Sequence, residues 1–237
     1  MDYTHPVNSI FINSIRTAIC SGVFLTQVHA AMVINEIDYD QPGTDLGEFI
    51  ELFNSGTGDI TLDGYTLDLI NGSTGGSYES INLNGLTIGA AAYLVMCDSA
   101  SSVPNCDYAF TASTGWFQNG GSSVGDAVAL YSGGVLLDSV VYEGIGTTLG
   151  AFAEGGTSAG ADSNSEILSL SRLPNGIDTD DNGNDFGIGC ITPGTANSTG
   201  PGDCTATPTV PLPAAFWLFG SGLLTLLGMG TKSYRRL

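Results

Sequence analysis

The sequence predicts an all-β domain built as an antiparallel β-sandwich, and two observations support this prediction. Apolar residues occur in short alternating runs, as in strands that bury one face, and these runs do not follow the period of a helix. Gly accounts for 34 of the 237 residues and charged residues for only 12% of them, which is typical of a loop-rich chain. A chain of this length accommodates one β domain with additional segments at its ends.

Seven segments combine alternating apolar residues with flanking turn residues, and we expect each of them to form a strand. Gly133-Gly134 separates two of these segments and is a two-residue turn typical of a β-hairpin. The Gly- and Ser-rich stretch 144–165 predicts a long loop. Several short strands without a helical period suit a sandwich. The predicted strands are 32–38, 48–54, 60–70, 91–98, 127–132, 135–143 and 166–172.

The same segments resemble a known family. "VINEIDYDQPGTDLGEFIELFNSG", followed by "ITLDGYTLDLING", resembles the opening of a lamin-tail domain. The later "VGDAVALYSGGVLLDSVVY", "LSRLPNGIDTDDNGNDF" and "TPGTAN" resemble the bacterial branch of that family, although Tyr65 stands where many relatives have Trp. The resemblance spans Val33 to Asn197 and implies an immunoglobulin-like sandwich. We therefore place this domain at residues 31–198.

The charge of the chain is strongly negative and unevenly distributed. The formal net charge is −19, and between Ala31 and Thr207 the one base, Arg172, stands against 23 acidic residues. A surface of this sign repels nucleic-acid phosphates and anionic lipid headgroups. We therefore expect no nucleic-acid partner, and we expect cations to be the favoured ionic partners.

The N-terminal segment has the parts of a secretory signal peptide. Arg16 precedes the short apolar run 17–28, and the chain then reads "VHA" up to Ala30, which is a small-residue exit from the signal. We expect cleavage after Ala30, so that residues 1–30 are removed. Lipidation at Cys20 is disfavoured because Ile19 precedes it where a small residue is required.

The C-terminal segment predicts a membrane helix with a fixed orientation. Residues 214–230 contain no charged side chain and, at about 1.5 Å per residue, nearly cross a typical hydrocarbon core of about 30 Å. The bases that follow this run are expected to stay in the cytoplasm, which places the acidic domain outside. These bases are Lys232, Arg235 and Arg236.

This tail also resembles a sorting signal of the PEP-CTERM type, in its VPLPA variety. A Pro-containing motif, an apolar helix containing "WLFGSGLL" and a basic end follow one another over residues 210–237, after a linker at 199–209. The resemblance implies an exosortase that cuts at the motif, which Pro211 and Pro213 hold extended outside the membrane. The protein would then be anchored in the inner membrane before release or transfer to the cell surface. The motif residues are Val210, Pro211, Leu212, Pro213 and Ala214.

Four cysteines remain after removal of the signal segment, and an even number in an exported chain indicates disulfides. Three connectivities are possible, and we expect the local one, Cys97–Cys106 with Cys190–Cys204, because each bond closes a short loop. A zinc site with four thiolates is disfavoured because the CxxC-like spacing is missing.

The sequence predicts no catalytic site. Both His residues of the chain lie in the segment 1–30, which removes the usual general base from the domain. Glu36, Glu48 and Glu51 could be considered as paired acids of a glycosidase, but Glu48 and Glu51 point to opposite faces of one strand. We expect a structural role for these glutamates, in which their carboxylates accept hydrogen bonds from loop N–H groups.

One motif indicates a metal. "DTDDNG" begins at Asp178 and matches the start of a calcium loop, with oxygen ligands at alternate positions and a Gly for the tight turn. The closing Glu of an EF-hand is missing, and the alternative is an Asx-rich turn that holds no metal. The candidate Ca²⁺ ligands are Asp178, Asp180, Asn182 and Asp185.

Together these features predict an exported, non-catalytic surface or extracellular-matrix protein whose sandwich binds or scaffolds a protein or polysaccharide. The alternative is an accessory or carbohydrate-binding module that works in trans with extracellular nucleases or hydrolases. A carbohydrate-binding module would present a planar row of exposed aromatic rings. The candidates for such a row are Tyr65, Tyr78, Tyr108, Trp116 and Phe117.

Overall fold

The computed structural model describes Met1, residues 31–99, 103–110 and 116–200, and Cys204. The predicted signal peptide, membrane helix, sorting motif and basic end therefore lie outside the described residues, apart from Met1. The elements are β1 (Met32–Asp38), β2 (Phe49–Asn54), β3 (Ile60–Thr61), β4 (Tyr65–Asn71), β5 (Gly76–Asn82), β6 (Thr87–Ile88), β7 (Tyr93–Asp98), β8 (Tyr108–Phe110), β9 (Asp126–Ser132), β10 (Val135–Tyr142), η1 (Glu154–Gly156), β11 (Leu168–Arg172), α1 (Asn182–Asp185) and β12 (Phe186–Cys190).

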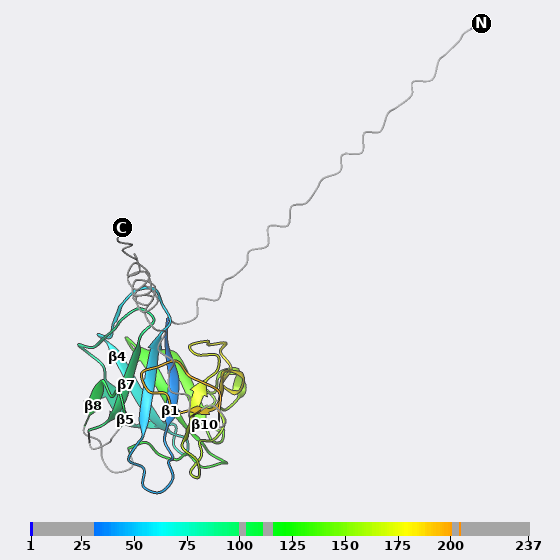
Figure 1. The fold of residues 1–237 in the computed structure, drawn as a ribbon. Helices are drawn as coiled ribbons and strands as arrows, with labels where there is room; N and C mark the ends of the chain where they lie inside the picture. The colour runs from blue at the N-terminus through cyan, green and yellow to red at the C-terminus, as the bar shows by residue number, and fades with distance from the viewer. Residues whose placement is uncertain (2–30, 100–102, 111–115, 201–203, 205–237) are drawn as a thin grey trace, which may run out of the picture.

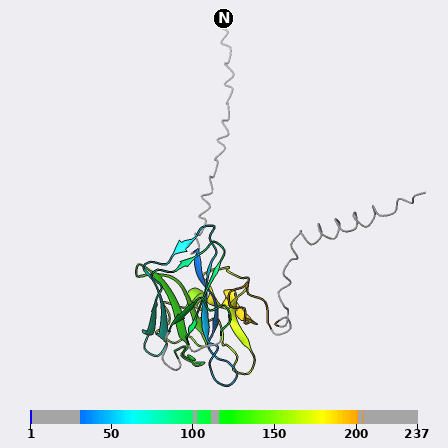
Figure 2. The ribbon, with the colours of Figure 1, turned by 60° about the vertical axis from the view of Figure 1, so that its left-hand side comes forward.

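Two sheets face each other (Figure 1), and the second orientation (Figure 2) shows the same two layers. The larger sheet has the order β12-β11-β1-β2-β7-β8, and the smaller has the order β10-β9-β4-β5. Neighbouring strands are antiparallel except for the short pair β7 and β8. The predicted all-β sandwich is thus confirmed.

The core lies between the two sheets because alternate side chains of each strand point inward. Ile34, Ile50 and Met96 come from the larger sheet, and Leu67 and Val128 come from the smaller one. All are fully buried in one continuous apolar cluster. Burial of these side chains is the main driving force for closing the sandwich.

All seven predicted strand segments contain a strand, but one of them is interrupted. The segment 60–70 divides into β3 and β4 because the chain turns at Gly64, whose φ of 82° suits Gly. The predicted hairpin between β9 and β10 is confirmed, with φ of 58° at Gly133 and 79° at Gly134. Both values lie in the region that a type I′ turn requires.

The loop expected at 144–165 forms a long connection that contains only η1. Leu149 lies in an apolar cluster with Ile70 and Ala127 of the smaller sheet. The connection then reaches the larger sheet, where Asp162 contacts Tyr39 just after β1. Among the helices of the described residues, none has the length and apolar character needed to cross a membrane.

Both predicted disulfides are present. Cys97 of β7 bonds to Cys106, and Cys190 of β12 bonds to Cys204. The first bond lies against the buried Phe49 at one end of the larger sheet. The second fastens the chain after β12 to the same sheet, where Thr199 also bridges to Gly189.

Candidate functional site

The base of the domain, Arg172, is fully buried in β11 and forms the centre of an ion cluster. Its Nη2 lies 3.2 Å from both carboxylate oxygens of Asp138 in β10. Its Nη1 donates to Asp185 at 2.9 Å and to Asp178 at 3.3 Å. The guanidinium also lies over the Phe186 ring, 4.6 Å from its centroid. One cation therefore serves three buried carboxylates.

Backbone hydrogen bonds connect this cluster to several elements. Arg172 Nε donates to the carbonyl of Ile34 in β1, and the N–H of Ile34 donates to Asp138 Oδ2 at 2.6 Å. Arg172 Nη1 also donates to the carbonyl of Ile177. The cluster thereby joins β1, β10 and β11 with the turn before α1. Buried pairs of this kind specify how sheets align, because a carboxylate left alone in the core is costly.

Two of the four residues of the predicted calcium loop bind a base in the structure. Asp178 and Asp185 both bind Arg172, and Asp185 also accepts hydrogen bonds from the N–H and hydroxyl of Thr179. Asp180 lies at the turn, with φ of 56°, and Asn182 begins α1 with a fully buried side chain. Of the four candidate ligands, Asp178 and Asp185 are thus brought together by the guanidinium of Arg172, which binds both carboxylates.

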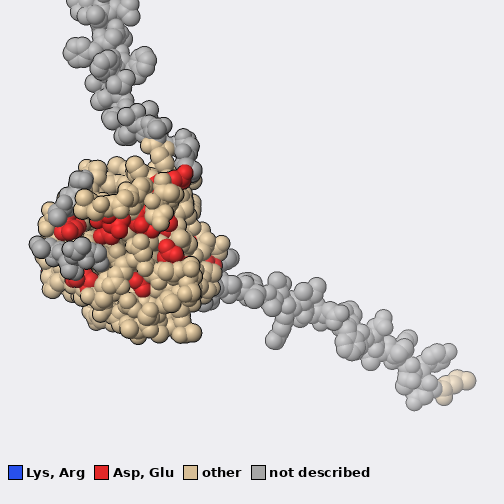
Figure 3. All heavy atoms as spheres, turned by 90° about the horizontal axis from the view of Figure 1, so that it is seen from below, with Lys and Arg blue, Asp and Glu red and all other residues tan. Residues whose placement is uncertain are grey.

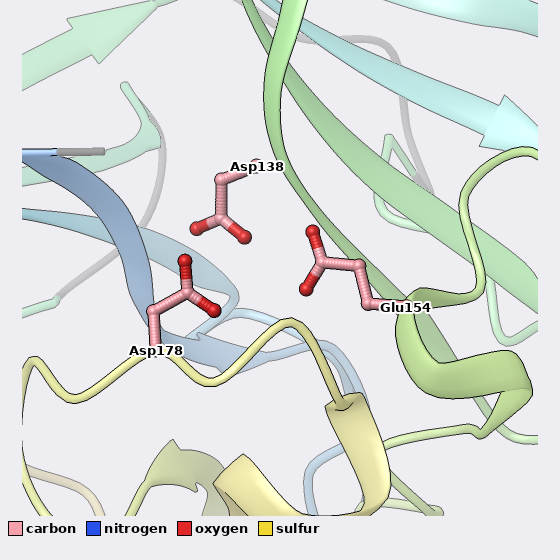
Figure 4. A group of neighbouring side chains, drawn as sticks. All are labelled: Asp138, Glu154 and Asp178. Carbon is pink, nitrogen blue, oxygen red and sulfur yellow. The ribbon is translucent and has the colours of Figure 1, made fainter. Parts of the chain in front are cut away.

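A different group of carboxylates comes together beside the guanidinium. Oxygens of Asp138, Glu154 and Asp178 lie within 4.8 Å of one another, and the three side chains point toward a common centre (Figure 4). They come from β10, η1 and the turn before α1. The sequence contains no local motif that links these positions, so their proximity could not be predicted. Arg172 already supplies a positive charge to two of the three.

Two of these carboxyl groups, Glu154 and Asp138, have raised pKa values. Burial, reinforced by Asp138 and Asp178, raises the pKa of Glu154 to about 8. Burial also raises the pKa of Asp138 to about 6, against the opposing effect of Arg172. Glu154 Oε1 accepts from the N–H of Ser139, whereas its buried Oε2 lacks a hydrogen-bond partner among the described residues. Near neutral pH, a proton on Glu154 therefore removes part of the excess negative charge.

Two other buried glutamates have the structural role expected of them. Glu36 accepts hydrogen bonds from Ser169 Oγ and from the N–H and hydroxyl of Thr192. Glu51 accepts from the Asn35 side chain and from the N–H of Gly194. These bonds fasten the segment after β12 onto β1 and β2. Burial raises the pKa of Glu36 to about 7 and that of Glu51 to about 8.

The aromatic residues proposed as a carbohydrate platform do not form one, and that expectation was wrong. Trp116 and Phe117 are only 3% and 1% exposed. Tyr65, Tyr78 and Tyr108 are half-buried and pack against the same core. Trp116 and Phe117 belong to the core cluster although they lie in the connection between β8 and β9. A planar exposed row of these five residues is therefore excluded.

The outer surface of the described residues carries charge of one sign. Arg172, which is fully buried, is the one Lys or Arg among the described residues. Seen from below, Asp and Glu gather across the end of the sandwich, and no Lys or Arg is visible on that face (Figure 3). This surface disfavours phosphate-bearing ligands.

The fold and the disulfides define an immunoglobulin-like β-sandwich with an acidic surface. Residues 26–144 match the family model described as Lamin Tail Domain, and the chain therefore belongs to the lamin-tail family. The search of curated proteins found no match. Among solved structures, the chain is similar to a DUF4876 family protein from Bacteroides thetaiotaomicron, with 11% identity, a TM-score of 0.42, and coverage of 76% of this chain and 75% of that one.

Proposed function

We propose that this lamin-tail protein is an exported, non-catalytic binding or scaffolding module that a C-terminal sorting signal delivers to the cell surface or matrix. The observation that carries the proposal is the pair of disulfides, Cys97–Cys106 and Cys190–Cys204. Disulfides form and persist in oxidising compartments and are rare in the cytosol. Their presence supports passage of the domain through such a compartment.

The chemistry of the domain supports a binding role over a catalytic one. The segment from Ala31 to Thr207 contains no His, and the buried carboxylates of Asp185, Glu36 and Glu51 bind Arg172 or loop N–H groups. A carboxylate that is held in this way is a structural acceptor rather than a free general base. The partner should be neutral or cationic, because the described surface lacks Lys and Arg.

In this proposal the C-terminal tail directs the protein to the membrane and then to the cell surface. Pro211 and Pro213 precede the apolar run 214–230, and three bases follow it. The Cys190–Cys204 bond fastens the chain to the sandwich shortly before this motif. An exosortase-type enzyme would cut at the motif while the helix holds the domain at the outer face of the inner membrane.

Mass spectrometry of the protein recovered from the producing cell tests this proposal. We expect a mature N-terminus at Ala31, a C-terminus between Val210 and Ala214, and four cysteines in two disulfides. An intact Arg236-Leu237 end on the surface protein would contradict the sorting step. The double variant Pro211→Ala/Pro213→Ala should retain the tail, whereas the control Pro208→Ala should be processed normally.

A further inference from the structure

A groove opens at the end of the sandwich where the β1–β2 connection meets the start of β11. Its volume is about 370 Å³, which is within the range of small-ligand sites. Its walls include Leu46, Phe49, Val103, Ile167 and Ile191, and Asp38 also lines it. The walls are therefore mostly apolar, with one carboxyl group among them.

The rim and the inner wall of this groove differ in exposure. Leu46 is 59% exposed and Ile167 is 72% exposed, although both are large aliphatic side chains. Exposed apolar side chains that border one groove are typical of a contact surface. Phe49, by contrast, is fully buried and packs beside the Cys97–Cys106 disulfide. The groove thus has a buried inner wall and an apolar rim that remains exposed among the described residues.

Asp38 is the charged residue of the groove lining, and it is only 1% exposed. Its Oδ1 accepts a hydrogen bond of 2.6 Å from the Gln41 side-chain amide, which closes over it. Its Oδ2 is buried and receives no hydrogen bond from a described donor. The neighbouring charged groups, Asp162 and Glu36, are both acidic. A buried carboxyl group is therefore short of donors and of positive charge.

Asp38 and Asp162 interact directly and behave as a carboxyl pair. Burial, reinforced by the negative charges of Asp162 and Glu36, raises the pKa of Asp38 to about 9. Burial also raises the pKa of Asp162 to about 6, while hydrogen bonds from the N–H groups of Ser163 and Tyr39 favour its charged form. The pair therefore carries about one proton near pH 7, as adjacent buried carboxyls do.

More acidic side chains lie near the β1–β2 connection, which forms part of the groove. Glu48 is close enough to Asp45, Asp98 and Asp40 for all three to raise its pKa, which burial brings to about 8. The β1–β2 connection, which carries Asp40 and Asp45, lies at the bottom in Figure 1, and that end is acidic when seen from below (Figure 3). An approaching cation is attracted to this end, and an anion is repelled.

We propose that the groove binds a primary ammonium group on an apolar stem, namely a Lys side chain of a partner protein. The ammonium would take the place of the Gln41 amide and donate to Asp38, which lines the groove and is paired with Asp162 behind it. Its methylene stem would pack between Leu46 and Ile167. The proton shared by the two carboxyls would leave to solvent, so that one positive charge replaces another.

Other occupants fit the groove less well. A neutral apolar group would make neither a hydrogen bond nor an ion pair with the buried carboxyl of Asp38. Ca²⁺ requires six to eight oxygen ligands, and apolar walls do not supply them. An ammonium group has three donors and a stem that tolerates apolar surface, so it matches both parts of the groove.

Isothermal titration calorimetry of the full-length protein tests this inference with two small probes. Nα-acetyl-lysine methylamide should bind at least tenfold more tightly than the norleucine analogue, which has the same stem without the amine. Titrations in two buffers of different ionisation enthalpy should show release of roughly one proton per lysine probe at pH 7. Equal affinity for the two probes, absence of binding at millimolar concentration, or absence of proton release would overturn the inference.

Variants locate the site. Asp38→Asn should reduce the affinity for the lysine probe at least tenfold, and Ile167→Ser should reduce it severalfold without a change in thermal midpoint, because Ile167 is exposed. The control Glu79→Gln removes a half-buried acid of β5 that does not line the groove, and this variant should bind normally. An unchanged affinity in Asp38→Asn would place binding elsewhere. This inference rests on the binding role proposed above but not on export. If the protein is processed correctly but does not bind the lysine probe, the lysine inference is refuted and the export proposal stands.

Discussion

The Arg172 centre and the Asp38 groove are both buried acidic clusters, but only one contains its own cation. At the centre, a single guanidinium binds Asp138, Asp178 and Asp185 and closes the cluster. At the groove, Asp38 and Asp162 lie together without a base, and they hold a proton instead. The one base of this domain is therefore buried as the counter-charge of carboxylates that hold the fold together. The second cluster depends on protons or on a ligand.

Removal of the internal cation should have the largest effect. Arg172→Met leaves three buried carboxylates without a counter-charge, and we expect a loss of about 3–5 kcal/mol in the free energy of unfolding. Urea denaturation at pH 7 measures this loss. Arg172→Lys, which keeps the charge but not the planar fork, should lose less. A loss below about 1 kcal/mol in Arg172→Met would mean that the cluster does not depend on the guanidinium.

A rise in pH should lower the stability of this domain. The pKa values of Asp38, Glu51 and Glu154 are raised to about 9, 8 and 8, so the folded state holds protons that the unfolded state has lost. Their contribution is complete below about pH 4 and is lost as pH rises toward 9. We expect the free energy of unfolding to fall by about 3 kcal/mol or more from pH 5 to pH 8. A stability that rises over this window would contradict these shifts.

Loss of the first disulfide should be milder and confined to the groove end. Cys97→Ala/Cys106→Ala opens a short loop beside Phe49, and we expect a loss of about 2–3 kcal/mol. Thermal unfolding of the variant against the oxidised parent measures it. Because Phe49 lines the groove, the variant should also bind the lysine probe more weakly. Unchanged binding would separate the groove from the disulfide.

The smallest effect should come from the cap of α1, next to the Arg172 centre. Asp181 accepts hydrogen bonds from the N–H groups of Gly183 and Asn184 and from Thr157 Oγ1. Asp181→Ala should lower the free energy of unfolding slightly, and Asp181→Asn should recover most of that loss, since Asn is also a good cap. Chemical denaturation of the two variants gives the difference. Equal losses in both would show that the charge rather than the cap matters.

The sequence was informative where the determinants are local. Alternation identified the seven strand segments, the Gly133-Gly134 pair identified the hairpin, and short spacing identified both disulfides. It did not predict β5 and β12, because the first is polar and exposed along much of its length and the second contains two Gly residues. Neither strand shows the regular alternation that marks a half-buried strand.

The candidate sites depended on contacts between distant segments, and there the sequence was less informative. Asp138, Glu154 and Asp178 meet only because η1 and the turn before α1 pack over β10. Asp38 and Asp162 meet because the long connection after β10 returns to the end of β1. The motif at Asp178 predicted a calcium loop, whereas a base in the neighbouring strand β11 binds two of its carboxylates. A local pattern cannot reveal such a partner.

Carboxyl-detected NMR of the full-length protein tests the comparison most directly, because it follows each Asp and Glu through a pH titration. The two-cluster account predicts that Asp38 titrates near pH 9, and that Arg172→Met raises the midpoint of Asp138 while it leaves Asp38 unchanged. Addition of the lysine probe should lower the midpoint of Asp38 and leave Asp138 unchanged. Titration of Asp38 below pH 5 in the free protein would contradict the account.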